Sequence, residues 1–273
     1  MVASLAELRT AQNASAVFQN EFWRDFYRAL SDGMTRTSLV KVSALALCLA
    51  LPAHAAESSS LVIALDLTKS VAVGAPGQRQ EFNKNVEATA EILAHTPADS
   101  HVTVIGITDH SFAEPFILLD ARIPADEGYF QERLTAARQA LVRAWAARAK
   151  GLAPSFKRAD ILGSLLLASQ IFQNSPKGRA MLIIFSNMRE NAGGVNLEGR
   201  NPQNAHLSVN RYAQGRDIPD LHGIEIHVLG ADNAGKSMSY WTALRDFWTF
   251  YFKRTGAVLK SYSVLRDPPD LGP

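Results

Sequence analysis

The amino-acid sequence predicts an α/β fold with a doubly wound, mostly parallel sheet, one antiparallel edge strand and helices on both faces, the Rossmann-like arrangement. Short apolar runs rich in β-branched residues lack strict alternation, as expected of strands buried on both faces. Apolar residues at helical spacing lie between these runs. The composition, 47% hydrophobic and 20% charged, is that of an ordinary globular chain.

The expected elements follow one another along the chain with short links. The parallel strands are predicted at LVIALDL (61–67), HVTVIGI (101–107), AMLIIF (180–185), IEIHVL (224–229) and AVLKSYSVL (257–265). The run PFILLDARI (115–123) follows the second strand too closely for a parallel crossover, so it is expected to be the antiparallel edge strand. Helices are predicted at 82–93, 130–141, 161–172 and 241–252, with Gly256 ending the last.

Residues 34–55 have the pattern of a secretory signal peptide. Arg36 and Lys41 precede an apolar run at 42–51, and Ala53 to Ala55 form an A-x-A cleavage site. The apolar run is shorter than the roughly 20 residues of a membrane span. We therefore expect cleavage after Ala55 and a periplasmic or secreted product. An uncut signal anchor stays open as the alternative and would be the chain's only link to a membrane.

This prediction divides the chain into three parts. Residues 1–33 form an upstream extension, either a mis-assigned start or a genuine cytoplasmic segment. Residues 34–55 form the signal peptide, and residues 56–273 form the folded domain. The only cysteine, Cys48, falls inside the signal peptide, so the mature domain can hold no disulfide or thiolate site.

The first strand ends in Asp66-Leu67-Thr68-Lys69-Ser70, a D-x-T-x-S pattern. Oxygen-bearing side chains at positions i, i+2 and i+4 can converge as the chain leaves the sheet. One carboxylate and two hydroxyls suit a hard cation such as Mg²⁺ or Mn²⁺, which retains waters and uses few protein ligands. As an alternative to metal binding, Thr68 and Ser70 would only form hydrogen bonds with the local backbone and cap the next helix; this alternative stays open.

The pattern resembles the metal-ion-dependent adhesion site of von Willebrand factor type A (vWA) domains. RADILGSLLLASQIF (158–172) is similar to the family's crossover helix, and MLIIFSNMREN (181–191) to its apolar strand ending in Ser-Asp. IEIHVLGAD (224–232) and YWTALRDFWTFYF (240–252) resemble the last strand–helix unit of bacterial secreted members. The resemblance covers most of residues 60–265 and implies a Rossmann-like domain that binds proteins at the carboxyl ends of its strands.

The metal site implied by this resemblance is partly degraded. Ala159 stands where the family has a threonine ligand, and Asn187 stands where it has an aspartate. Asp160 is next to the missing threonine and either compensates as a ligand or caps its helix. The candidate metal ligands are thus Asp66, Thr68, Ser70, Asp160 and Asn187.

A second motif, GADNAGKS from Gly230 to Ser237, fits the phosphate-loop pattern G-x-x-x-x-G-K-[ST]. It predicts nucleotide binding through Lys236 and Ser237 as an alternative function. Its place after the penultimate strand, in an exported chain, favours instead a rim loop whose Ser237 or Ser239 caps the following helix. We expect no enzymatic activity, because a haloacid-dehalogenase-type phosphatase would need a carboxylate where Thr68 stands.

The sequence therefore predicts an exported protein-binding module. A net charge of +2 gives no support for a nucleic-acid partner. The expected partner is a protein, bound at the carboxyl edge of the sheet, whose carboxylate completes the coordination of a divalent cation. A metal-free version of the same surface and a metal-free structural scaffold of the same fold stay open.

Overall fold

The computed structural model describes residues 58–72, 80–192, 195–198, 209–210, 212–214, 218–233 and 235–272. The predicted signal peptide and upstream extension lie outside the described residues. Residues 56–273 form a unit separate from residues 1–55. Among the described residues, no helix is long and apolar enough to cross a membrane.

One six-stranded sheet runs through the domain in the order β3-β2-β1-β4-β5-β6. Its strands are β1 (Ser59–Asp66), β2 (Ser100–Ile107), β3 (Ile117–Arg122), β4 (Arg179–Phe185), β5 (Glu225–Leu229) and β6 (Val258–Tyr262). The helices are α3 (Glu81–Ala94), α4 (Glu132–Ala149), α5 (Ile161–Gln173) and α7 (Met238–Arg254), with a 3₁₀ turn, η1, at Lys69–Val71.

The strand pairing confirms the predicted architecture. β1 lies between β2 and β4 and is parallel to both, and β5 and β6 continue the parallel part of the sheet. β3 pairs antiparallel with β2 and forms the edge, as its short link to β2 predicted. Because β1 is central, its carboxyl end lies in the middle of the sheet edge, where chains on either side approach it.

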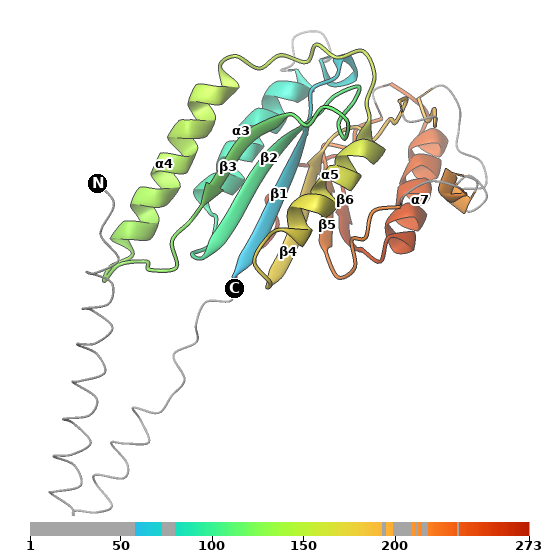
Figure 1. The fold of residues 1–273 in the computed structure, drawn as a ribbon. Coiled ribbons are helices and arrows are strands. Elements are labelled where there is room, and N and C mark those ends of the chain that lie inside the picture. The colour runs from blue at the N-terminus through green and yellow to red at the C-terminus, as the bar shows by residue number, and fades with distance from the viewer. Residues whose placement is uncertain are drawn as a thin grey trace, which may run out of the picture. The chain divides into compact units, whose positions relative to one another are not determined.

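Helices cover both faces of the sheet (Figure 1). Leu61, Ile63 and Leu65 of β1 share one apolar core with α3 and α4. The residues that alternate with these, including Val62 and Ala64, share a second core with α5 and α7 on the other face. All five β1 side chains are almost completely buried. Burial on both faces explains why the strands read as continuous apolar runs rather than as alternating ones.

The aromatic face of α7 forms much of the second core. Trp248 is fully buried, contacts the rings of Tyr251 and Phe252, and donates its indole N–H to the Met188 carbonyl at 2.8 Å. Met188 has a positive φ of 61°, a conformation that costs a non-glycine residue energy. The Trp248 bond therefore fixes the backbone just after β4, where the candidate site begins.

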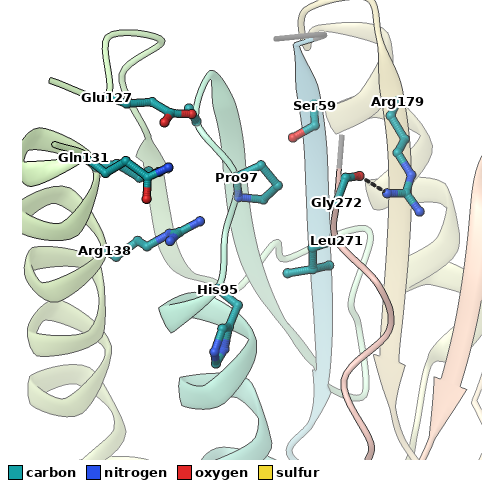
Figure 2. Close-up of a pocket in the computed structure, with 11 residues that line it drawn as sticks. Ser59, His95, Pro97, Glu127, Gln131, Arg138, Arg179, Leu271 and Gly272 are labelled. Atoms are coloured by element: carbon teal, nitrogen blue, oxygen red, sulfur yellow. Dashed lines mark hydrogen bonds between the residues drawn. The ribbon is translucent and has the colours of Figure 1, made fainter. Parts of the chain in front are cut away.

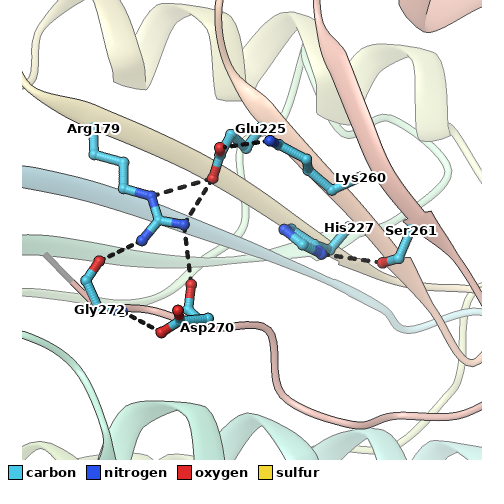
Figure 3. A network of polar contacts seen from close by, with 7 residues as sticks. All are labelled: Arg179, Glu225, His227, Lys260, Ser261, Asp270 and Gly272. Carbon is cyan, nitrogen blue, oxygen red and sulfur yellow. Dashed lines mark hydrogen bonds and ion pairs between the residues drawn. The ribbon is translucent and has the colours of Figure 1, made fainter.

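The segment after β6 crosses the α3/α4 face and is held by two arginines. Arg266 contacts Glu81 and donates Nε to the Asn85 side-chain oxygen at 2.6 Å. Arg179 donates to the Asp270 carbonyl at 3.0 Å and to the Gly272 carbonyl, while forming an ion pair with Glu225 (Figure 3). These contacts bring the segment from the carboxyl edge of the sheet back to the amino edge.

Candidate functional site

Asp66 is the last residue of β1 and is completely buried at the carboxyl edge of the sheet. Its Oδ1 accepts the Thr68 backbone N–H at 2.9 Å, and its Oδ2 accepts the Ser186 hydroxyl at 2.6 Å. Ser186 directly follows β4, the neighbouring strand, so two strand ends hold one carboxylate. The carboxylate is thereby oriented before any ligand arrives.

Two hydroxyls and an amide extend this arrangement. Thr68 Oγ1 lies 2.9 Å from Ser70 Oγ, and the Asn187 side-chain nitrogen donates to Ser70 Oγ at 3.1 Å. The Asn187 oxygen accepts the Arg189 backbone N–H at 3.2 Å. We call Asp66, Thr68, Ser70, Ser186 and Asn187 the Asp66 cluster. It unites four of the five predicted site residues and adds Ser186, which was not among the predicted ligands.

The fifth predicted residue, Asp160, is placed as a helix cap. It is the N-cap of α5, and its Oδ1 accepts the Gly163 backbone N–H at 2.9 Å. The capping alternative foreseen for this residue is therefore present in the structure. Ala159 beside it is buried and contributes no side-chain oxygen.

Replacing Asp160 with alanine is expected to lower the free energy of unfolding by about 0.5–2 kcal/mol, because α5 loses its cap. Chemical denaturation with and without Mg²⁺ measures this loss. The loss should be the same in both conditions if Asp160 acts only as a cap. A loss that appears only with Mg²⁺ present would instead make Asp160 a ligand.

Burial raises the pKa of Asp66, since the low-dielectric surroundings disfavour its charged form more than its hydrogen bonds favour it. A cation held beside the carboxylate would act in the opposite direction. Cation binding at this site should therefore strengthen as the pH rises, because the proton must leave before the metal is held.

The donor set fits a hard cation only in part. Neighbouring ligands of an octahedral Mg²⁺ at 2.0–2.1 Å lie about 2.9 Å from one another, the separation found between the Thr68 and Ser70 hydroxyls. Asn187, however, turns its amide nitrogen toward Ser70, so in this geometry it supports a ligand without supplying an oxygen. Among the described residues, no three His, Cys, Asp or Glu side chains gather in one place, so hydroxyls would have to carry the coordination.

A second carboxyl group, Glu190, is completely buried close to this edge. It accepts the backbone N–H groups of Leu162 at 2.9 Å and Ala192 at 2.7 Å, which ties the β4 loop to the first turn of α5. Burial, with a smaller contribution from Asp160, raises the pKa of Glu190 to about 8. The sequence offered one signal for this residue, a carboxylate five positions after a buried strand.

The GADNAGKS stretch forms a turn that leads into α7. Gly230 has a φ of 71° and directly follows β5, and the Lys236 backbone N–H donates to the Asn233 carbonyl at 2.8 Å. Ser237 is the N-cap of α7, its hydroxyl accepting the Tyr240 backbone N–H at 3.2 Å. The expected capping role of Ser237 is thus present, and nucleotide binding through Lys236 stays a prediction.

Several solved structures have a fold similar to that of this chain. The SpRpn10 VWA domain shares 12% identity over 79% of this chain and 97% of its own, with a TM-score of 0.41. The PilB minor pilin from Streptococcus sanguinis shares 10% identity over 79% of this chain and 59% of its own, with a TM-score of 0.51. The sheet order, with one antiparallel edge strand, is that of a Rossmann-like, vWA-like fold.

The vWA resemblance predicted from the sequence is therefore confirmed for the fold. A further similar structure is a von Willebrand factor type A protein from Catenulispora acidiphila, with 15% identity over 74% of this chain and 43% of its own, and a TM-score of 0.38. This chain thus spans only part of the pilin and of the Catenulispora protein. No family model and no curated protein matches the chain. At these identities the likeness extends to the fold and not to ligands.

Proposed function

We propose that this vWA-like domain is an exported protein-binding module that recognises its partner at the carboxyl edge of the sheet. The main support for this proposal is the Asp66 cluster. Its buried carboxylate accepts two hydrogen bonds, and the hydroxyls of Thr68 and Ser70 in the same cluster lie 2.9 Å apart. Polar side chains converging where the central strand ends form the expected ligand site of a doubly wound sheet. The predicted signal peptide at 34–55 supports export.

If binding of the partner depends on a cation, Asp66, Thr68 and Ser70 hold Mg²⁺ or Mn²⁺. Water and a carboxylate of the partner fill the remaining positions. Lys69 is exposed between the two hydroxyl-bearing residues and would contact the partner directly.

Calorimetric titration with Mg²⁺ and with Mn²⁺ tests the cation. We expect binding by the wild type and its loss in Ser70→Ala, because this change removes one of three ligands. Ser239→Ala removes a comparable hydroxyl near the start of α7 and should leave binding unchanged. Asn187→Asp replaces the amide nitrogen near Ser70 with an acceptor oxygen and a charge, and should tighten binding by about tenfold.

One result of the titration would show that the domain binds no cation. Absence of heat in both the wild type and Asn187→Asp, with unchanged thermal unfolding, would remove the metal from the proposal. A metal-free protein-binding surface at the same edge would then stand alone.

A further inference from the structure

The amino edge of the sheet lies at the opposite end from the Asp66 cluster. The described chain enters the domain there, at Ser58, and β1 begins at the next residue, Ser59. The Ser59 backbone N–H donates to the Asp99 carbonyl, and the Asp99 backbone N–H donates to the Pro124 carbonyl, both at 3.1 Å. The loop 124–131, which joins β3 to α4, therefore lies beside the entry of the chain. We call this region the entry edge.

Two adjacent aromatic side chains project from this loop into solvent. Tyr129 is 90% exposed and Phe130 is 85% exposed, and their rings meet edge to face with centroids 4.8 Å apart. Fully burying one large apolar side chain contributes about 1.5–3 kcal/mol, so covering the pair would contribute a few kcal/mol. A fold that leaves both rings in water forgoes that stabilisation unless another surface covers them.

The loop is braced in this conformation by hydrogen bonds that do not involve the rings. The Glu132 carboxylate accepts the backbone N–H groups of Tyr129 at 3.3 Å and Phe130 at 2.8 Å. Asp126 accepts the Gly128 N–H at 2.9 Å and forms an ion pair with Arg133. Gly128 has a φ of 81°, which favours glycine. The rings are thus presented by a defined turn.

The same loop lines a cavity of about 220 Å³ at the entry edge. Glu127 and Gln131, which flank the aromatic pair in sequence, line it together with Ser59 and Leu271 (Figure 2). The aromatic pair, the start of β1 and the end of the described chain therefore share one end of the domain.

The uncut-anchor alternative for the sequence before Ser58 names a surface that could cover the pair. The apolar run 42–51 ends seven residues earlier. Seven extended residues span at most about 25 Å. If this run is retained in a bilayer as an uncut signal anchor, the entry edge stays within reach of the lipid surface. Tethering at such a distance gives a high effective concentration, so even a weak contact becomes populated.

We propose that the entry edge rests on the lipid bilayer, with Tyr129 and Phe130 inserted at the interface, when the N-terminal segment is retained. Aromatic side chains favour the membrane interface, where a ring meets the apolar boundary and a tyrosine hydroxyl stays hydrated. The loop has no excess of cations, since Asp126, Glu127 and Glu132 accompany Arg133. The contact with the bilayer therefore depends on insertion of the two rings and not on attraction to anionic lipid. It directs the Asp66 cluster, at the other end of β1, away from the bilayer.

Site-directed spin labelling of the full chain tests this orientation. Ala53→Leu and Ala55→Leu prevent processing, because the cleavage site needs small residues, and Cys48→Ala removes the native thiol. A nitroxide is then placed at Phe130→Cys or, as a control, at Met238→Cys, which is exposed at the start of α7. The proteins are reconstituted into phosphatidylcholine vesicles.

We expect the label at 130 to collide with lipid-soluble oxygen more than with a water-soluble nickel chelate, and the label at 238 to show the reverse. Adding Tyr129→Ser should make position 130 more accessible to the chelate. Equal accessibility to the chelate at 130 and 238 would overturn the proposal. Spin–spin broadening between labels at 130 would also overturn it, because a second copy of the chain would then cover the pair.

Discussion

Replacing Trp248 with alanine is expected to lower the free energy of unfolding by about 3–5 kcal/mol, the usual cost of deleting a fully buried large aromatic side chain. The ring contacts Phe247, Tyr251 and Phe252, and its N–H satisfies the Met188 carbonyl at 2.8 Å. The variant would leave a cavity in the α5/α7 core and an unpaired carbonyl at the positive-φ residue after β4. Equilibrium denaturation of the mature chain measures the loss.

Two matched variants separate these contributions. Trp248→Phe keeps most of the packing but removes the N–H, so it should cost about 1–3 kcal/mol. Phe130→Ala removes an exposed ring and should change the free energy of unfolding by no more than about 0.5 kcal/mol. A loss below 1 kcal/mol for Trp248→Ala would contradict the packing of α7 against the sheet.

The stability of the domain is expected to fall as the pH rises from about 4.5 to 8, through Glu190. The pKa of this carboxyl is about 8 in the folded chain, above its ordinary value of 4.5, so in this window the folded state holds a proton that the unfolded state has released. The stabilising contribution is complete below pH 4.5 and is lost as the pH passes through 8. One such proton changes the free energy of unfolding by up to about 1.4 kcal/mol per pH unit.

Comparison with Glu190→Gln isolates this contribution from those of other groups. The amide is neutral at every pH and keeps one oxygen to accept a backbone N–H. The difference in unfolding free energy between the two proteins should therefore shift in favour of the variant as the pH rises. Parallel pH profiles for the two proteins would show that folding does not raise the pKa of Glu190.

The fold was predictable from the sequence because its strands are buried on both faces. Continuous apolar runs identified β1, β2, β4 and β5, and the short link after β2 identified β3 as the antiparallel edge. The last helix begins at Met238, in agreement with the predicted capping by Ser237 or Ser239, although its apolar face was recognised only over 241–252. Local signals of this kind act over a few residues and can be read directly from the sequence.

The site was predictable only where its residues belong to a local pattern. Asp66, Thr68 and Ser70 follow one strand, so their spacing indicated that they converge. Ser186 and Glu190 depend on contacts with β1 and α5 that are far apart in sequence, and nothing in their immediate neighbours specifies those contacts. The amide orientation of Asn187 likewise depends on Ser70 and Arg189 together.

The two ends of the domain thus have different chemistry. At the carboxyl edge Ser70 is partly exposed beside the buried Asp66 and Thr68, and at the amino edge two aromatic rings are exposed. A domain that binds a partner at one edge and rests on lipid at the other would hold its binding surface outward. Each of these two assignments can fail without the other.

Photo-crosslinking in the cells that make the protein tests whether a protein partner binds at the carboxyl edge. A photoreactive phenylalanine analogue replaces Lys69, which is exposed beside the Asp66 cluster, or Lys177, which is exposed just before β4 at the other end of the sheet. We expect a discrete protein adduct at position 69 and none at position 177. No adduct at position 69, or the same adduct at both positions, would contradict it.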